Sequence, residues 1–239
     1  MVKRDIAEAV DLGIQYTPLM FINGVEFRGW EVPGVVKKAL TELDGTAPVL
    51  TAENDKPAPA IEKYLEDWRA QPMRRNPVDP HPHYLVGTPT AKVQVLVFGD
   101  YDDENTAKLD LTIRQLVQGR SDYGYSFRAY PASNECNPKL TKAFTDQACA
   151  AAKACEAAGV LGGDAAYKKM HEWLLSREGN LSVDFASKAA TAVGLDPAKL
   201  AATMNDPAVA AAITEDVNAA GTMGVIQIPQ GFVNGKWVP

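Results

Sequence analysis

The three cysteines are the residues of this chain whose chemistry would be most specific. Cys136, Cys149 and Cys155 leave one thiol over if any two pair, and the sequence has no C-x-x-C motif. A redox-active dithiol of the usual spacing is therefore absent from the sequence. Cys149 and Cys155 lie six residues apart on one predicted helix and point to different faces, so we do not expect them to pair.

The three histidines give little support for a metal site, because only His81 and His83 are close together. We predict no metal and no cofactor. His171 shares a predicted helix face with Tyr167 and Leu174. With no cysteine or serine nucleophile identified to partner it, a core or interfacial histidine is favoured over a catalytic one.

Charge and hydropathy exclude several classes of protein. The net charge is −6, and no basic cluster is longer than Arg74-Arg75, which disfavours nucleic-acid binding. No apolar run approaches the roughly 20 residues that span a bilayer. Residues 1–5 lack the apolar region of a secretory signal, and we interpret Met1 as the start of a fragment.

The elements that must position these residues indicate a mixed α/β sheet over residues 91–239. A buried strand at 93–98 precedes a helix, and a second strand runs from Tyr125 to Tyr130. Residues 141–222 have helical patterns throughout. A strand–turn–strand closes the chain, so strands separated by helices predict the α/β class.

The N-terminal third has a different organisation. Residues 1–45 end in a predicted helix, 31–43, and residues 46–90 form a Pro-rich linker. This linker contains one short amphipathic helix over 61–68.

An internal repeat relates the two ends of the chain. Residues 5–28 align with 216–239 without a gap, and both copies predict a helix ending at Gly, a Pro, a short strand and an Asn-Gly turn. The identical pairs are Asp5/Asp216, Ala9/Ala220, Gly13/Gly224, Pro18/Pro229, Phe21/Phe232, Asn23/Asn234 and Gly24/Gly235.

Four segments resemble the DsbA-like family of thioredoxin-fold disulfide oxidoreductases and isomerases. They are GTPTAKVQVLVFGDY (87–101), FRAYP (127–131), KMHEWLL (169–175) and GVIQIPQGFVNG (224–235). The resemblance implies a thioredoxin-like fold with a helical insertion at about 139–205. It also implies cis peptide bonds before Pro18 and Pro229, with Pro229 facing the active site, and a periplasmic or other extracytoplasmic location.

The sequence departs from this family at the catalytic cysteine pair. The C-P-x-C motif of the family is replaced by Asp103, Glu104, Asn105 and Thr106. Asp103 and Thr106 cannot form a mixed disulfide, so we expect this domain to be inert in thiol exchange, and name no catalytic residue. The helix dipole and the free N–H groups at a helix N-terminus lower the pKa of a thiol placed there. They also favour an anion, so Asp102 or Asp103 can cap this helix. The alternative is a new acid/base or ligand site beneath Pro229.

The resemblance also implies a structural disulfide between Cys136 and Cys149, which would stabilise the fold by ~3 kcal/mol. The alternative is two unpaired, buried thiols. Cys155, among alanines, is predicted to be a small core residue.

Residues 1–45 hold only the last helix, hairpin and closing helix of a thioredoxin-like unit. One explanation is that a first domain precedes Met1, with a cysteine pair roughly 110 residues upstream. The other is that residues 1–45 dock on a second copy of the chain and complete its fold, which gives a homodimer.

Three functions stay open. The first is a relative of the DsbA-type oxidoreductases in which this domain is redox-inactive and any activity lies in the preceding domain. The second is a non-catalytic module, peptide-binding or chaperone-like, for extended or unfolded polypeptide. The third and least favoured is an enzyme of another class.

Overall fold

The computed structural model describes residues 2–11, 14, 17–22, 25–27, 33–42, 60–74 and 84–238. The chain forms two compact units, Met1–Ala70 and Gln71–Pro239. Within the predicted linker over 46–90, residues 46–59 and 75–83 lie outside the described residues. So do the Asn-Gly turn at 23–24 and the histidine pair at 81 and 83.

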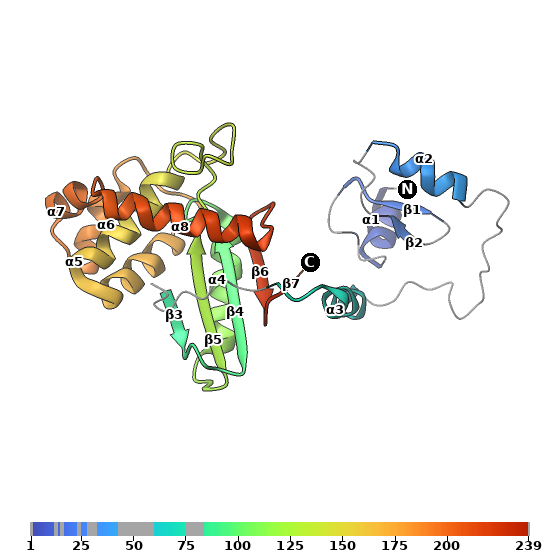
Figure 1. Ribbon diagram of the computed structural model, residues 1–239, viewed down its shortest axis with the longest axis horizontal. Helices are drawn as coiled ribbons and strands as arrows, with labels where there is room; N and C mark the ends of the chain where they lie inside the picture. The colour runs from blue at the N-terminus through green and yellow to red at the C-terminus, as the bar shows by residue number, and fades with distance from the viewer. Residues whose placement is uncertain are drawn as a thin grey trace. The chain divides into compact units, whose positions relative to one another are not determined.

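A five-stranded mixed sheet forms the centre of the C-terminal unit (Figure 1). Its strands lie in the order β3 (Tyr84–Gly87), β5 (Tyr123–Ala129), β4 (Val93–Gly99), β6 (Gln230–Val233) and β7 (Lys236–Val238). β4 and β5 are parallel, and the other neighbouring pairs are antiparallel. The α/β class predicted from the order of elements is confirmed.

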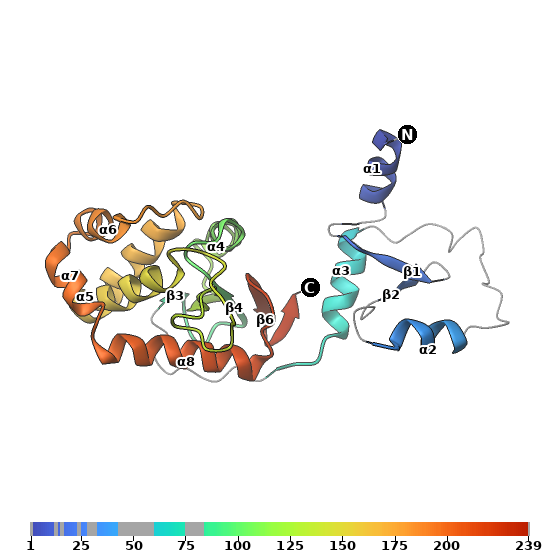
Figure 2. The ribbon, with the colours of Figure 1, turned by 90° about the horizontal axis from the view of Figure 1, so that it is seen from above.

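Helices cover both faces of this sheet. Figure 2 shows α4 (Glu104–Val117) and α8 (Pro207–Met223) on opposite sides of the strands. The apolar stripe of α8 that contains Val209, Ile213 and Val217 is buried. The helical insertion lies between β5 and α8 in the sequence, and consists of α5 (Ala148–Leu175), α6 (Phe185–Val193) and α7 (Pro197–Thr203).

Two boundaries differ from those expected from the sequence. β3 pairs with β5 and belongs to the sheet, whereas the sequence put the start of the domain at about residue 91. A four-residue edge strand after a proline-rich segment carries too little periodicity to be recognised. The insertion begins at Ala148, not at about 139. Tertiary hydrogen bonds hold the residues before it as a loop, among them Phe144 N to Ala132 O at 2.7 Å.

Residues 71–74 fasten the end of α8 to the β6–β7 hairpin. The backbone N–H of Arg74 donates to Gly235 O at 2.7 Å. Its guanidinium donates to the carbonyl oxygens of Met223 and Gly224. A cation is stabilising at this position because the last carbonyls of a helix carry partial negative charge. Arg74 thus fixes the backbone that leads into the Pro229 loop.

The N-terminal unit contains a hairpin and three short helices among its described residues. They are α1 (Val2–Asp11), β1 (Met20–Ile22), β2 (Val25–Phe27), α2 (Val35–Glu42) and α3 (Ala60–Ala70). The predicted helix at 31–43 is observed as α2, and the amphipathic helix at 61–68 as α3. The Thr17–Pro18 peptide bond is cis.

Candidate functional site

The N-terminus of α4 is the position at which the sequence analysis placed the missing cysteine pair. Asp103 is the N-cap residue, with φ −115° and ψ 124°. Its carboxylate accepts hydrogen bonds from Thr106 N at 2.6 Å and from Thr106 Oγ1 at 2.7 Å. Asp103 and Thr106, the residues that the resemblance aligns with the missing cysteines, are therefore bonded to one another. Of the two capping candidates, Asp102 and Asp103, it is Asp103 that caps this helix.

The loop after α5 lies directly against this helix end. A Cβ atom added at Gly179 would lie 2.9 Å from Glu104 N and 3.2 Å from Asp102 O. Gly179 has a positive φ of 75°, so both its backbone conformation and the contact favour glycine. The first turn of α4 is thus partly covered by backbone, and Glu104 points outward to Lys108, 2.5 Å away.

Asp100 anchors the end of β4 to the loop after β5. This side chain is buried, and it accepts hydrogen bonds from Asp102 N at 2.9 Å, Ala132 N at 2.9 Å and Thr145 Oγ1 at 2.6 Å. Burial raises the pKa of the Asp100 carboxyl. With three protein donors already bonded, Asp100 has a structural role that the sequence analysis missed.

Asp102 ties the same turn to the helical insertion. Its carboxylate accepts from Gln147 N at 3.0 Å and from Leu181 N at 3.4 Å. Burial raises the pKa of Asp102. Asp102 therefore joins the turn between β4 and α4 to the residue before α5 and to the loop after it.

Pro229 lies at the same end of the sheet. The Ile228–Pro229 peptide bond is cis. Gln230 pairs with Phe98, so the preceding residue, Pro229, comes next to the end of β4, where the chain turns into α4. Ile226 in this loop is 83% exposed, and Pro229 is half-buried.

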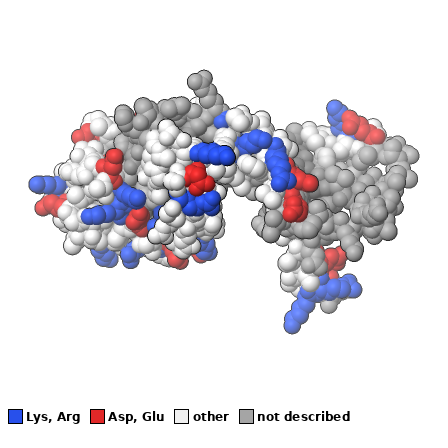
Figure 3. All heavy atoms as spheres, turned by 90° about the horizontal axis from the view of Figure 1, so that it is seen from below, with Lys and Arg blue, Asp and Glu red and all other residues white. Residues whose placement is uncertain are grey.

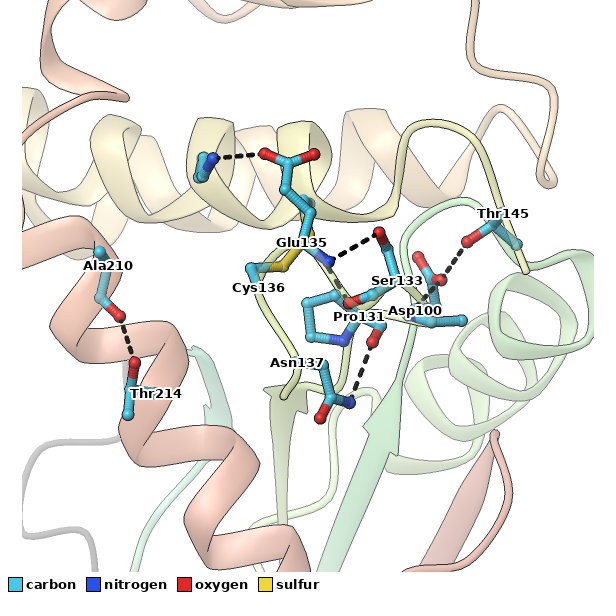
Figure 4. Close-up of a disulfide and its surroundings, with 12 residues drawn as sticks. Asp100, Pro131, Ser133, Glu135, Cys136, Asn137, Thr145, Ala210 and Thr214 are labelled. Atoms are coloured by element: carbon cyan, nitrogen blue, oxygen red, sulfur yellow. Dashed lines mark hydrogen bonds and ion pairs between the residues drawn. A yellow bond between two sulfur atoms is a disulfide. The ribbon is translucent and has the colours of Figure 1, made fainter. Parts of the chain in front are cut away.

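The structure joins Cys136 to Cys149, with a Cα–Cα distance of 5.8 Å (Figure 4). The bond links the loop after β5 to the first turn of α5. Near it, Asn137 Nδ2 donates to Pro131 O at 3.1 Å, and Glu135 forms an ion pair with Lys153 at 2.8 Å.

Cys155 is the third cysteine and is a buried, free thiol. Burial raises its pKa well above the usual value. A buried, protonated thiol is a poor nucleophile. None of the three cysteines therefore has the properties of an attacking thiolate.

His171 lies in a buried polar cluster between α4, α5 and the sheet. Its Nε2 is 3.1 Å from Asp110 Oδ1, and its Nδ1 is 3.1 Å from the Tyr101 hydroxyl. The ring of Tyr84 stacks on the imidazole, with 3.7 Å between ring centroids. Burial lowers the pKa of His171. The core position expected for His171 is the one observed.

Asp110 is the centre of this cluster. Tyr125 OH donates to its Oδ1 at 2.9 Å, and Arg114 Nε donates to its Oδ2 at 2.7 Å. Burial alone would raise the pKa of Asp110, but the hydrogen bond from His171 and the charge and hydrogen bond of Arg114 outweigh it and leave the pKa lowered. Asp110 is therefore ionised. The sequence gives one signal of this role: Asp110 is an acidic residue on a helix face that is otherwise rich in small and apolar residues.

Among the residues that the structure describes, no group of three His, Cys, Asp or Glu side chains could hold a metal ion. No helix in the described ranges is long and apolar enough to cross a membrane. On the face shown in Figure 3, acidic and basic side chains are interspersed over the C-terminal unit.

Comparison with known proteins decides the family. The model of the DSBA-like thioredoxin domain family matches residues 60–239. The chain belongs to this family. The DSBA-like match spans the whole C-terminal unit together with α3.

Solved structures of DSBA-like and related proteins share this fold. Oxidised BdbD from Bacillus subtilis superposes with a TM-score of 0.57 at 18% identity, covering 70% of this chain and 89% of that protein. α-DsbA2 from Wolbachia pipientis, a thiol-disulfide exchange protein, gives 0.52 at 17% identity over 74% and 84%. The catalytic domain of Proteus mirabilis ScsC gives 0.54 at 12% identity over 74% and 88%.

Two curated relatives have a different name. They are Na⁺/H⁺ antiporters: NhaA 1 of Salinispora arenicola, 29% identical, and NhaA 3 of Salinispora tropica, 27% identical. Each match covers 67% of this chain but only 23% of the antiporter. The chain therefore spans about a quarter of the length of these relatives.

Proposed function

We propose that the C-terminal unit is a redox-silent DSBA-like domain that binds extended polypeptide beside cis-Pro229. The observation that carries this proposal is the hydrogen-bonded pair Asp103 and Thr106 at the start of α4. Disulfide exchange proceeds through attack by a thiolate and a mixed disulfide, which a carboxylate and a hydroxyl cannot form. The family's fold is kept, and the group that performs the family's chemistry is replaced by a helix cap.

The loop before Pro229 supports the binding role. Ile226 and Gln227 are exposed, and Ile228 is half-buried. Next along β6, a Cβ atom added at Gly231 would meet nothing within 4 Å, so the face of the strand is open at this position. An exposed apolar side chain beside an open strand face suits an extended peptide that supplies apolar contacts.

We also place this domain in an extracytoplasmic compartment. The support is the Cys136–Cys149 disulfide, because such bonds persist in oxidising compartments and are rare in the reducing cytosol. Antiport is not proposed for this chain, because the matched segment is less than a quarter of each antiporter.

The binding proposal is tested with a fluorescently labelled, reduced and carboxymethylated lactalbumin, followed by fluorescence anisotropy. Ile226→Gln removes the exposed apolar contact and should weaken binding about 5-fold, equivalent to roughly 1 kcal/mol. Leu116→Gln is the matched control, since Leu116 is an exposed apolar residue near the other end of α4. Absence of binding, or equal weakening by both variants, would refute the proposed role.

A further inference from the structure

The N-terminal unit repeats the local geometry that surrounds the Pro229 site. Both Thr17–Pro18 and Ile228–Pro229 are cis. In the hairpins that follow, Phe21 pairs with Glu26 as Phe232 pairs with Trp237, the same register. Residues at the same offset thus have the same pairing in both units.

The helix that precedes each cis proline ends in the same way. Ile14 N donates to Ala9 O at 2.8 Å, and Val225 N donates to Ala220 O at 2.9 Å. These hydrogen bonds span the C-terminus of α1 and of α8 respectively. The likeness of the two segments therefore extends from sequence to hydrogen bonding.

Burial is where the two segments differ. Ile213 and Val217 of α8 are each 1% exposed, whereas the residues at the same offset in α1, Val2 and Ile6, are 71% and 58% exposed. The hairpins differ in the same direction, because Phe232 is 1% exposed and its counterpart Phe21 is 38% exposed. One apolar face is covered in the C-terminal unit and open in the N-terminal unit.

In the C-terminal unit this apolar face packs against strands β4 and β5 and against helix α5, which all precede α8 in the chain. α8 lies on β5, and the ring of Phe232 meets that of Phe98 on β4 edge to face, 6.2 Å between centroids. β4, α4 and β5 occupy residues 93–129, well before α8 begins at Pro207. The described part of the N-terminal unit holds no strands that correspond to β4 and β5.

We propose that α1 and the β1–β2 hairpin are the second half of another thioredoxin-like unit. A strand–helix–strand segment preceding Met1 in the same polypeptide covers the face formed by Val2, Ile6 and Phe21. The order in the C-terminal unit, where the covering half comes first in the same chain, supports this occupant. The curated relatives, about four times the length of the match, show that domains of this kind occur in longer chains. This inference is independent of the function proposed for the C-terminal unit.

The first test is the reading frame upstream of the Met1 codon in the source genome. The repeat requires a strand–helix–strand segment there, whose helix begins roughly 110 residues before Met1. A reading frame without such a segment would overturn the proposal, whatever the behaviour of any variant.

The second test compares the 239-residue chain with the chain extended through that segment, by amide hydrogen exchange. We expect exchange of the α1 amides to slow at least ~10-fold in the extended chain, because a covered helix opens less often. The amides of α8 should exchange alike in both chains. Equal α1 exchange rates in both would overturn the proposal.

Two substitutions in the extended chain make the test specific for the apolar face. Ile6→Asp should abolish the slowing at α1, since it puts a charge into the covered face. Ala7→Asp is the matched control, because Ala7 and its counterpart Asn218 are both exposed. If the two substitutions act alike, the face is not the contact. A dimer of the 239-residue chain that Ile6→Asp dissociates would show that a second copy covers this face, and would also overturn the proposal.

Discussion

At the scale of single residues, three aspartates around the start of α4 have structural roles. Asp103 accepts hydrogen bonds from the backbone N–H and the hydroxyl of Thr106, and Asp100 and Asp102 bond to neighbouring segments. The Asp103 side chain accepts the capping hydrogen bond that an N-cap residue typically makes. Asp103 therefore gives α4 a capped N-terminus.

Removing the cap should therefore cost stability. We expect Asp103→Ala to lower the free energy of unfolding by about 1–2 kcal/mol, because Thr106 N and Oγ1 lose their acceptor. Urea denaturation of the full chain measures the change. Glu104→Ala is the control, since its exposed ion pair with Lys108 should contribute no more than ~0.5 kcal/mol. Equal losses in the two variants would show that the Asp103 bonds do not contribute as proposed.

The buried histidine should make stability depend on pH. Burial lowers the pKa of His171 in the folded chain, so the unfolded chain binds a proton more readily. Stability from this group is complete above the unfolded pKa of about 6.5 and is lost as the pH falls towards the folded pKa. The raised pKa values of Asp100 and Asp102 act in the opposite direction, adding stability as the pH falls.

A substitution separates these contributions. Gln at position 171 keeps one donor for Asp110 and one acceptor for Tyr101 but does not titrate. Between pH 7.5 and 5.5 we expect the unaltered chain to lose on the order of 1 kcal/mol of unfolding free energy relative to His171→Gln. Parallel pH profiles for the two proteins would contradict the assignment of this dependence to His171.

At the scale of elements, the sequence predicted most of the fold because the elements have strong local signals. Asp196-Pro197 and Asp206-Pro207 mark the starts of α7 and α8, and both aspartates accept the expected backbone hydrogen bonds. Alternating valines marked β4. These features depend on neighbours in sequence, which is why a single sequence reveals them.

The features that were missed depend on distant contacts. The residues near Asp110 in the sequence do not predict its contacts with His171 and Tyr125. Those contacts form only when α5 and β5 pack on α4. The loop before α5 was predicted to be helical from residue 141. Its bonds to Asp100, Asp102 and Ala132 override that preference. Tertiary bonds of this kind have no periodicity to detect.

The disulfide is an element-scale constraint with its own prediction. Replacing both Cys136 and Cys149 with serine should lower the free energy of unfolding by ~3 kcal/mol, since the unfolded chain regains the entropy of the open loop. Urea denaturation with and without dithiothreitol provides the measurement. The unaltered chain should lose a similar amount in reductant, and the double variant should be insensitive. Three titratable thiols in the unreduced, denatured chain would show that the bond does not form.

At the scale of the whole molecule, the chain has the fold of the DSBA-like family, and its sequence has no C-x-x-C motif. The DSBA-like match covers residues 60–239, and the solved relatives share the arrangement of sheet and helical insertion. Fold alone does not carry activity, which depends on the groups at the site. The claim that thiol exchange is absent therefore rests on residues 103–106 and on the state of three cysteines.

The most direct test of this claim is insulin reduction by dithiothreitol, followed by turbidity, with the unaltered 239-residue chain. The expected rate equals that without protein. Asp103→Cys combined with Thr106→Cys restores a dithiol at the helix N-terminus and should raise the rate severalfold, since the helix field lowers a thiol pKa. Measurable acceleration by the unaltered chain would contradict the account, because it would require a reactive thiol where the structure has only a disulfide and one buried cysteine.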